Sequence, residues 1–304
     1  MTTRPAPGAL RPSLLAAGVV ATMAMASSSV LVHWAAAPAV ALAFWRTAGG
    51  AVLLGAVAGV GRGEPGRSAT IPWAPTVAAG VALGVHFWAW LASLEMTTVA
   101  ASVTLVSTAP IFVALGRAVA GEDLARRSWL AIVVMFAGGA LLTTGGGEAG
   151  EGAAHDLGGD ALALVGAVTM AIYLELGARV RATVDTTRYA AIAYASAAVV
   201  LVPPALVSGA ALTGFDRTTW LVIGAMILGP QLAGHTVLNA LLQRLGALTV
   251  ALVLLLEPIG ATALAWGFLD QRPSALSLVG VVVVLAGLGL HLAAATGSTE
   301  PPGG

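Results

Sequence analysis

The chain has 304 residues, of which 58% are hydrophobic and 9% charged, and its formal net charge is zero. A soluble domain carries roughly 25% charged residues, so this chain has too few polar side chains to coat a water-facing surface, and a soluble globular protein is excluded. Zero net charge removes the electrostatic basis for nucleic-acid binding, and the absence of cysteine excludes disulfides, thiolate catalysis and cysteine-ligated metals.

Ten apolar segments are long enough, or nearly so, to cross a bilayer. A crossing helix needs about 20 residues, because each residue adds about 1.5 Å and the hydrocarbon core is about 30 Å thick. The segments lack the alternation of a porin strand, which predicts an all-α membrane protein of ten transmembrane helices. In chain order the expected spans are Ser13–His33, Pro38–Val60, Trp73–Leu94, Val99–Val119, Trp129–Thr144, Ala161–Ala178, Tyr189–Ser208, Thr219–Leu242, Ala247–Phe268 and Ala275–Ala295.

The first segment has an alternative interpretation as a cleaved signal peptide. Arg4 and Arg11 precede it, and the run Ala24-Met25-Ala26-Ser27 resembles a signal-peptidase site. The apolar stretch continues past that run and has a counterpart later in the chain, so we interpret it as the first crossing.

Arginine placement predicts the orientation, because cytoplasmic loops carry the excess of basic residues. With a cytoplasmic N-terminus, Arg217 and Arg272 lie outside, Arg46 lies within the membrane, and the acidic loop Gly145–Asp160 is external. The remaining arginines are then cytoplasmic: Arg4, Arg11, Arg62, Arg67, Arg117, Arg126, Arg127, Arg179, Arg181, Arg188 and Arg244. We expect a multi-pass protein of the plasma membrane with both termini in the cytoplasm.

The two halves of the chain resemble each other at a shift of 148 residues. Under this shift Pro110-Ile111 falls on Pro258-Ile259, and Glu122 falls on Asp270. The halves are expected at residues 1–147 and 148–304, with five crossings each. An odd number of crossings forces the second copy to enter the membrane upside down, and such inverted repeats typically enclose a site near the midplane and support alternating access.

Three residues that are charged at neutral pH in water are expected inside the membrane: Arg46, Glu175 and Glu257. A charge in hydrocarbon costs at least about 2.5 kcal/mol, so each needs a partner. Arg46 is expected to face the interior, either to bind a carboxylate or anionic substrate group or to form a structural ion pair. The two glutamates could bind and release protons, because a low dielectric favours the neutral carboxyl. Alternatively, Glu257 forms a structural hydrogen bond where its neighbouring proline breaks the helix. The alternative for Glu175 is a side chain that extends to the membrane interface.

Polar and aromatic side chains add further candidates for a substrate or proton path. His86 and His235 lie in equivalent helices of the two halves, and histidine titrates near physiological pH. Gln231, His235 and Asn239 are spaced four apart and form one polar stripe, which favours a water-filled path over mere contact between helices. Trp45 and Tyr173 are the remaining site candidates, the alternative for the tryptophan being an interfacial anchor.

Several short patterns occur in a fixed order: Phe44-Trp45-Arg46, Ala109-Pro110 followed by Gly121-Glu122, Gln231 to His235 with Asn239, and Leu256-Glu257-Pro258 with Leu269-Asp270. In this order within a double repeat, the sequence resembles the EamA-type carriers of the drug/metabolite transporter superfamily. Asp270 stands where the family usually has glutamate, which preserves the charge. The resemblance implies secondary transport, often efflux, of amino acids, other small metabolites or drugs.

No zincin, Walker or nucleophile-elbow motif occurs, so we expect no enzyme, no cofactor, no metal site and no coupling to ATP. The leading hypothesis is a secondary active or facilitative exporter, monomeric or homodimeric, whose partners are a small-molecule substrate, membrane lipids and, if coupled, protons. The alternative is an intramembrane enzyme acting on a lipid-linked substrate, which would need a polar catalytic loop at the membrane surface. A channel is a further rival.

Overall fold

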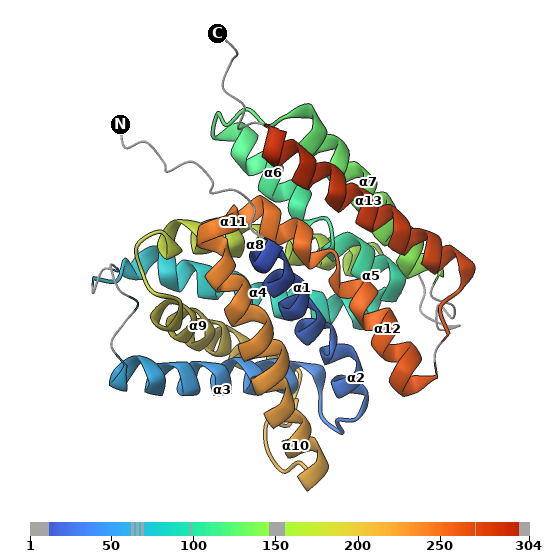
Figure 1. The fold of residues 1–304 in the computed structure, drawn as a ribbon. Helices are drawn as coiled ribbons and strands as arrows, with labels where there is room; N and C mark the ends of the chain where they lie inside the picture. The colour runs from blue at the N-terminus through green and yellow to red at the C-terminus, as the bar shows by residue number, and fades with distance from the viewer. Residues whose placement is uncertain are drawn as a thin grey trace.

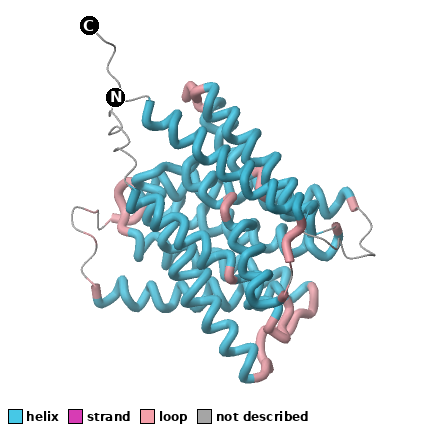
Figure 2. The backbone as a smooth tube through the Cα atoms, turned by 45° about the vertical axis from the view of Figure 1, so that its right-hand side comes forward, coloured by secondary structure: helices cyan, strands magenta, loops and turns pink. Residues whose placement is uncertain are grey.

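A computed structural model of the chain describes residues 12–61, 64, 67, 70–97, 99–145, 156–270 and 272–297. These residues form helices joined by short turns, and none of them lies in a β-strand (Figures 1 and 2). The helices are α1 (Pro12–Ala26), α2 (Ser28–His33), α3 (Ala39–Val60), α4 (Trp73–Met96), α5 (Val99–Val106), α6 (Ala109–Val119), α7 (Arg126–Gly145), α8 (Leu157–Arg181), α9 (Thr186–Val207), α10 (Arg217–Met226), η1 (Ile227–Thr236), α11 (Val237–Leu254), α12 (Glu257–Leu269) and α13 (Ala275–Gly297).

Eight helical stretches are long and apolar enough to cross a membrane, counted over the described ranges. The prediction of an all-helical, multi-pass chain is confirmed, but ten separate spans are not found. The expected span Trp129–Thr144 forms a helix, α7, but α7 is not one of the eight. The expected span Ala247–Phe268 is divided between the end of α11 and the short α12. The stretch Arg217–Leu254 is 38 residues long and contains one non-helical residue, Gly246, with φ 75° and ψ 166°.

Two helix breaks recur at the interval found in the sequence. The chain turns at Ser107-Thr108 between α5 and α6, and again at residues 255–256 between α11 and α12. Pro110 and Pro258 each occupy the first turn of the helix that follows. Proline has no amide hydrogen to donate, so it is tolerated at a helix start and disfavoured in a helix interior. The matched prolines therefore set equivalent breaks in the two halves.

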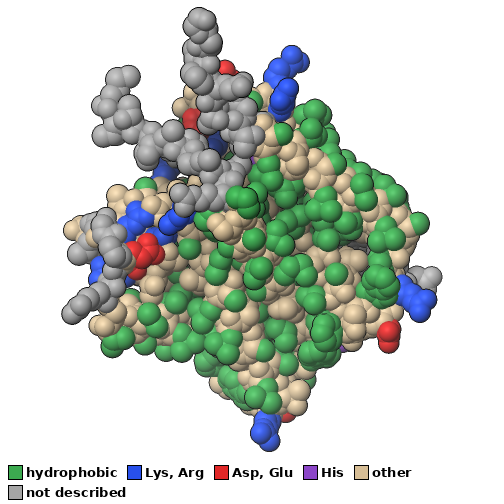
Figure 3. Space-filling model, viewed as in Figure 1, with side chains coloured by type: hydrophobic (Ala, Val, Ile, Leu, Met, Phe, Trp, Pro, Cys, Tyr) green, Lys and Arg blue, Asp and Glu red, His purple; other side chains and the backbone are tan. Residues whose placement is uncertain are grey.

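Helices from the two halves of the chain interleave. α3 packs on α9, and α4 packs on both α8 and α9, while α7 pairs with α13 at one edge of the molecule (Figure 1). The outer face in Figure 3 is covered by hydrophobic side chains, and the charged side chains gather at its margins. Valines such as Val60 and Val119 are about 90% and 89% exposed. This distribution is typical of a surface solvated by lipid.

Arginines Arg4, Arg11 and Arg62 and most of the acidic loop, residues 146–155, lie outside the described residues. The structure therefore does not test the predicted orientation, which rests on these arginines together with the described ones. Among the described cytoplasmic candidates, Arg179, Arg181 and Arg188 fall close together at the end of α8 and the start of α9.

Glycines allow α7 and α13 to approach closely. A Cβ on Gly280 would lie 2.7 Å from the Gly138 carbonyl oxygen, and a Cβ on Gly138 would lie 2.6 Å from the Val284 nitrogen. Both obstacles are backbone atoms, which cannot rotate away. Such small-residue contacts are the usual means of packing helices in lipid, where no hydrophobic force drives helices together.

Replacing Gly280 with leucine is expected to destabilise the protein by about 1–3 kcal/mol, because the added side chain must push the two helices apart. The matched control is Gly289→Leu on the same helix, where nothing lies within 4 Å of a built Cβ. Thermal unfolding of the detergent-purified variants measures the difference. Equal midpoints for the two variants would contradict close α7–α13 packing.

Candidate functional site

Arg46 is buried inside the helix bundle, with 6% of its surface exposed. It projects from α3, and its Nε donates a hydrogen bond to Gln231 Oε1 at 3.0 Å. The guanidinium carbon lies 4.8 Å from the centre of the Phe87 ring on α4. A cation over an aromatic face is attracted by the ring's quadrupole. Arg46 therefore faces the interior, as expected, where it contacts a glutamine and a phenylalanine.

The segment that carries Gln231 is a π-helix, η1 (Ile227–Thr236), which sequence reasoning took for regular α-helix. Pro230 lies inside it and has no amide hydrogen, so the usual hydrogen-bond ladder is interrupted there. The Thr236 hydroxyl donates to the Gln231 carbonyl oxygen at 3.1 Å, five residues back. Isolated π segments are frequent at functional sites because they redirect side chains. Only the proline and its neighbouring glycines signalled this segment in the sequence.

Two histidines lie next to Phe87, with ring centroids 5.3 Å away for His86 and 5.7 Å away for His235. The His235 ring meets the Phe87 ring edge-on, with centroids 5.7 Å apart, and His235 is 4% exposed. His86 stacks on Trp90 and its Nδ1 hydrogen-bonds the Gly166 carbonyl at 2.9 Å. Because a carbonyl only accepts, that Nδ1 carries the proton. The structure thus brings Arg46, His86 and His235 around one phenyl ring that the sequence did not single out.

Glu257 completes the charged set around Arg46. It is the first residue of α12, directly after the chain break, and its side chain is half-buried. Its charge interacts electrostatically with Arg46. A carboxylate in the first turn of a helix also faces the positive end of the helix dipole. The break at Pro258 therefore places a carboxylate within electrostatic range of the buried arginine, with no ion pair between them in the described contacts.

Asn239 belongs to an adjoining network of buried hydroxyls. Tyr173 on α8 donates to Asn239 Oδ1 at 2.6 Å, and Asn239 Nδ2 donates to the Tyr194 hydroxyl at 3.2 Å. That hydroxyl also lies 3.0 Å from Thr236 Oγ1. Gln231, His235 and Asn239 are all nearly inaccessible, so the polar stripe does face inward. Tyr194 and Thr236 were not predicted; buried tyrosine far from the membrane boundary is the signal that could have found them.

Two candidates lie apart from this group. Glu175 forms an ion pair with Arg117, whose Nε lies 2.8 Å from the carboxylate, and Arg117 also faces Glu122 at 3.8 Å. Trp45 donates its ring N–H to the Leu212 carbonyl at 2.6 Å and packs edge-on against Trp220. The first contact joins α6 to α8, and the second fixes a loop between α9 and α10. Neither side chain contacts Arg46 or Gln231 in the described hydrogen bonds and ion pairs.

A further polar cluster, which the sequence did not indicate, joins the two halves between the α3–α4 connection and the α8–α9 turn. Glu64 accepts hydrogen bonds from the Thr186 amide at 3.0 Å and its hydroxyl at 2.7 Å, and lies 3.5 Å from the Arg181 guanidinium. Burial acts to raise the pKa of Glu64, but these hydrogen bonds and the Arg181 charge outweigh it and hold that pKa below its usual value. The cluster stabilises the contact between the halves at this end.

Comparisons with known proteins agree with this architecture. The profile described as the EamA-like transporter family matches residues 12–144 and again residues 157–293. An uncharacterized transporter of Archaeoglobus fulgidus is 28% identical over 203 residues, which cover 66% of this chain and 69% of that protein. One solved structure, whose description is "Crystal structure of protein", has a TM-score of 0.79 and 19% identity to this chain. The match covers 95% of this chain and all of the other. At that identity the likeness shows the fold alone.

Proposed function

We propose that the chain, which belongs to the EamA-like transporter family, is a secondary transporter that moves small anionic or zwitterionic metabolites, amino acids among them, by alternating access. Membership of this family and the apolar helices make it a multi-pass membrane protein of a transporter family. The substrate class rests on the chemistry around Arg46, and the outward direction rests on the resemblance to efflux carriers.

The observation that carries the proposal is a pair of neighbouring side chains, Gln231 and Arg46, that keep hydrogen-bond donors available. Gln231 Nε2 is buried and has no described partner at full hydrogen-bond geometry, although the Gln231 amide lies near the Tyr194 hydroxyl. Its neighbour Arg46 makes its described hydrogen bond through Nε, which leaves the terminal guanidinium donors for another group. A buried donor without a partner costs about 1–3 kcal/mol. A substrate carboxylate would accept from both side chains, and charge-assisted hydrogen bonds of this kind are the strong ones.

The proposal includes ten crossings arranged as two inverted repeats. Counting α5 with α6 as one crossing, and dividing Arg217–Leu254 at its non-helical Gly246, leads to five crossings in each half. The equivalent proline breaks and the double match to one family profile support this arrangement. In such carriers the site at the repeat interface is reached from one side at a time. Arginine placement favours cytoplasmic termini in the plasma membrane.

Proton coupling is the second part of the proposal. Glu257 interacts electrostatically with Arg46 in the low-dielectric interior, so a proton and the ammonium group of a zwitterionic substrate would compete for its carboxylate while Arg46 holds the substrate's own carboxylate. Uncoupled, facilitated diffusion through the same site is the alternative outcome. Enzymatic activity has no part in the proposal.

Counterflow in proteoliposomes tests the function directly. A thermal-shift screen of the purified protein against amino acids, nucleosides and drugs first selects a ligand, because a ligand stabilises the state that binds it. Vesicles loaded with that unlabelled ligand are then expected to accumulate labelled ligand transiently and saturably. Flux without counterflow would indicate a channel, and modification of an added lipid without any flux would indicate an enzyme; either result overturns the proposal.

A further inference from the structure

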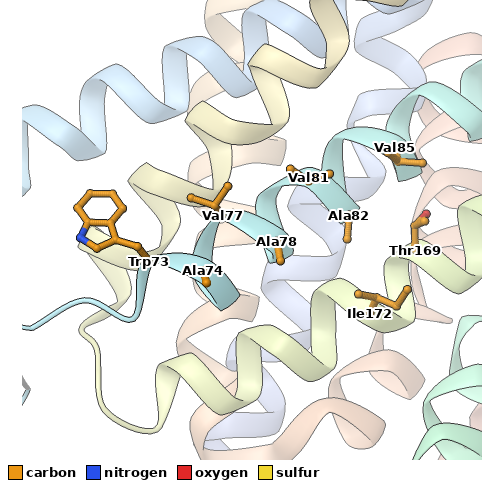
Figure 4. Close-up of a pocket in the computed structure, with 9 residues that line it drawn as sticks. All are labelled: Trp73, Ala74, Val77, Ala78, Val81, Ala82, Val85, Thr169 and Ile172. Carbon is orange, nitrogen blue, oxygen red and sulfur yellow. The ribbon is translucent and has the colours of Figure 1, made fainter.

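A groove of about 700 Å³ runs along the outside of the contact between α4 and α8 (Figure 4). On α4 it is lined by Ala74 and Ala78, which lie beside the larger Val77 and Val81. On α8 it is lined by Thr169 and Ile172. Alanines four residues apart lie on one face of a helix and form a furrow beside the valine ridge. The groove therefore lies on the surface that faces the membrane and follows the helix direction.

The walls of the groove offer a ligand almost no hydrogen-bonding group apart from the Trp73 indole N–H at one end. Thr169 is the one hydroxyl residue among those lining it, and its hydroxyl donates to the Val165 carbonyl of its own helix at 2.7 Å. A polar solute would lose its hydrogen bonds to water on entering such a surface. The part of a ligand that fills this groove must therefore be hydrocarbon.

A positive charge lies at one end of the groove. α4 and α8 run antiparallel, since Met96 at the end of α4 contacts Gly159 at the start of α8. Trp73, the first residue of α4, therefore lies towards the end of α8. Arg179 lies seven residues, or about two turns, beyond Ile172 on the same face of α8, and its side chain is exposed.

The two arginines at the end of α8 are used differently. Arg181 is 1% exposed and turns inward to Glu64 and the Asn239 carbonyl. Arg179 has no ion pair or side-chain hydrogen bond in the part of the chain that the structure describes. The free guanidinium on α8 and the Trp73 indole on α4 therefore lie towards the same end of the apolar furrow, where the headgroup of a membrane lipid lies.

We propose that the α4–α8 groove binds one acyl chain of an anionic phospholipid, whose phosphate is held by Arg179 beside Trp73. A second copy of the chain fits the groove less well. In a dimer with a two-fold axis along the membrane normal, the same patch of both copies would be in contact. The two Arg179 side chains would then lie at the same depth and repel each other, and no lining residue is a carboxylate that could neutralise them. A phosphate supplies the missing anion.

The lipid would bind at the contact between the two halves of the chain. The inner side of this α4–α8 contact is held by the hydrogen bond between His86 and Gly166, and the lipid covers its outer side. Lipid occupancy therefore stabilises the arrangement of α4 on α8 described here. This inference does not depend on which solute is transported, and its test requires no transport.

Binding is tested by thermal unfolding and native mass spectrometry of the detergent-purified protein with phosphatidylglycerol or phosphatidylcholine of identical chains. The wild type is expected to prefer the anionic lipid about fivefold, since a basic residue near an anionic headgroup contributes about 1 kcal/mol. Arg179→Gln should abolish this preference, and Ala78→Leu, which fills the furrow from an exposed position, should weaken binding of both lipids.

The controls separate this site from general effects. Arg244→Gln removes an exposed charge on α11, and Ala56→Leu adds the same bulk to an exposed position on α3; both should leave lipid binding at the wild-type level. Equal affinity of the wild type for the two lipids, or unchanged binding by Ala78→Leu, would overturn the proposal. So would a wild-type dimer that Ala78→Leu converts to a monomer, because a second copy would then occupy the groove.

Discussion

Replacing Arg46 with glutamine is expected to lower the apparent affinity for a carboxylate substrate by about 100-fold. Removing one partner of a buried, hydrogen-bonded charge pair typically costs 2–5 kcal/mol, and about 1.4 kcal/mol corresponds to a factor of ten. The variant keeps a polar side chain beside Phe87 but loses the charge and the planar fork of donors. Initial rates of uptake into proteoliposomes, measured over a range of substrate concentrations, report the change.

Three companion variants distinguish binding from folding. Arg46→Lys keeps the charge but not the fork, so it should recover part of the affinity. The double variant Arg46→Gln with Glu257→Gln leaves no unpaired buried charge, so it should recover stability while substrate affinity stays low. Arg117→Gln removes a cation that is paired with Glu175, away from Arg46, and should leave affinity unchanged. A normal affinity in Arg46→Gln would assign Arg46 to structure alone.

Replacing Glu257 with glutamine is expected to remove the dependence of transport on the pH gradient while counterflow persists. In the wild type an acidic outer side should drive export, because the carboxyl binds a proton there as substrate leaves and releases it inside as the next substrate binds. One coupled proton corresponds to about tenfold accumulation per pH unit of gradient, since one unit is worth about 1.36 kcal/mol. Accumulation against imposed gradients measures this ratio directly, and the variant should show none.

Glu175→Gln is the matched control for this experiment. It removes the same group from a membrane helix, but from a carboxylate already paired with Arg117 at 2.8 Å. Its pH dependence should therefore remain like that of the wild type. If Glu257→Gln also retains it, the carboxyl facing Arg46 has no part in coupling, and the transporter is facilitative or uses another proton site.

The helices could be predicted from the sequence because a membrane leaves the backbone few options. Within lipid each segment must satisfy its own hydrogen bonds, so the length of an apolar run nearly fixes the helix; the run Pro38–Val60 became α3 (Ala39–Val60). The position of Arg46 within that run predicted a buried charge. The prolines at positions 110 and 258 coincide under the 148-residue shift, and the structure has a break before each, although the sequence suggested a broken helix only beside Glu257.

Contacts between distant residues could not be predicted in the same way. Phe87 looks like any apolar residue of α4, and only the packing of α3 on its neighbours places it beneath Arg46. The π-helix around Gln231 depends on a proline whose effect varies with its surroundings. Trp45 stands beside Arg46 in the sequence, yet consecutive helical residues point about 100° apart, and its ring is held by a loop instead.

Access to the Arg46 region from the two sides of the membrane tests the central claim most directly. The chain has no cysteine, so Thr236→Cys would place a single thiol next to Gln231 and Tyr194. In a variant that retains transport, a membrane-impermeant thiol reagent should label this position from either side, and saturating substrate should slow labelling from both. Labelling from one side only, at a rate that substrate leaves unchanged, would contradict alternating access to this site.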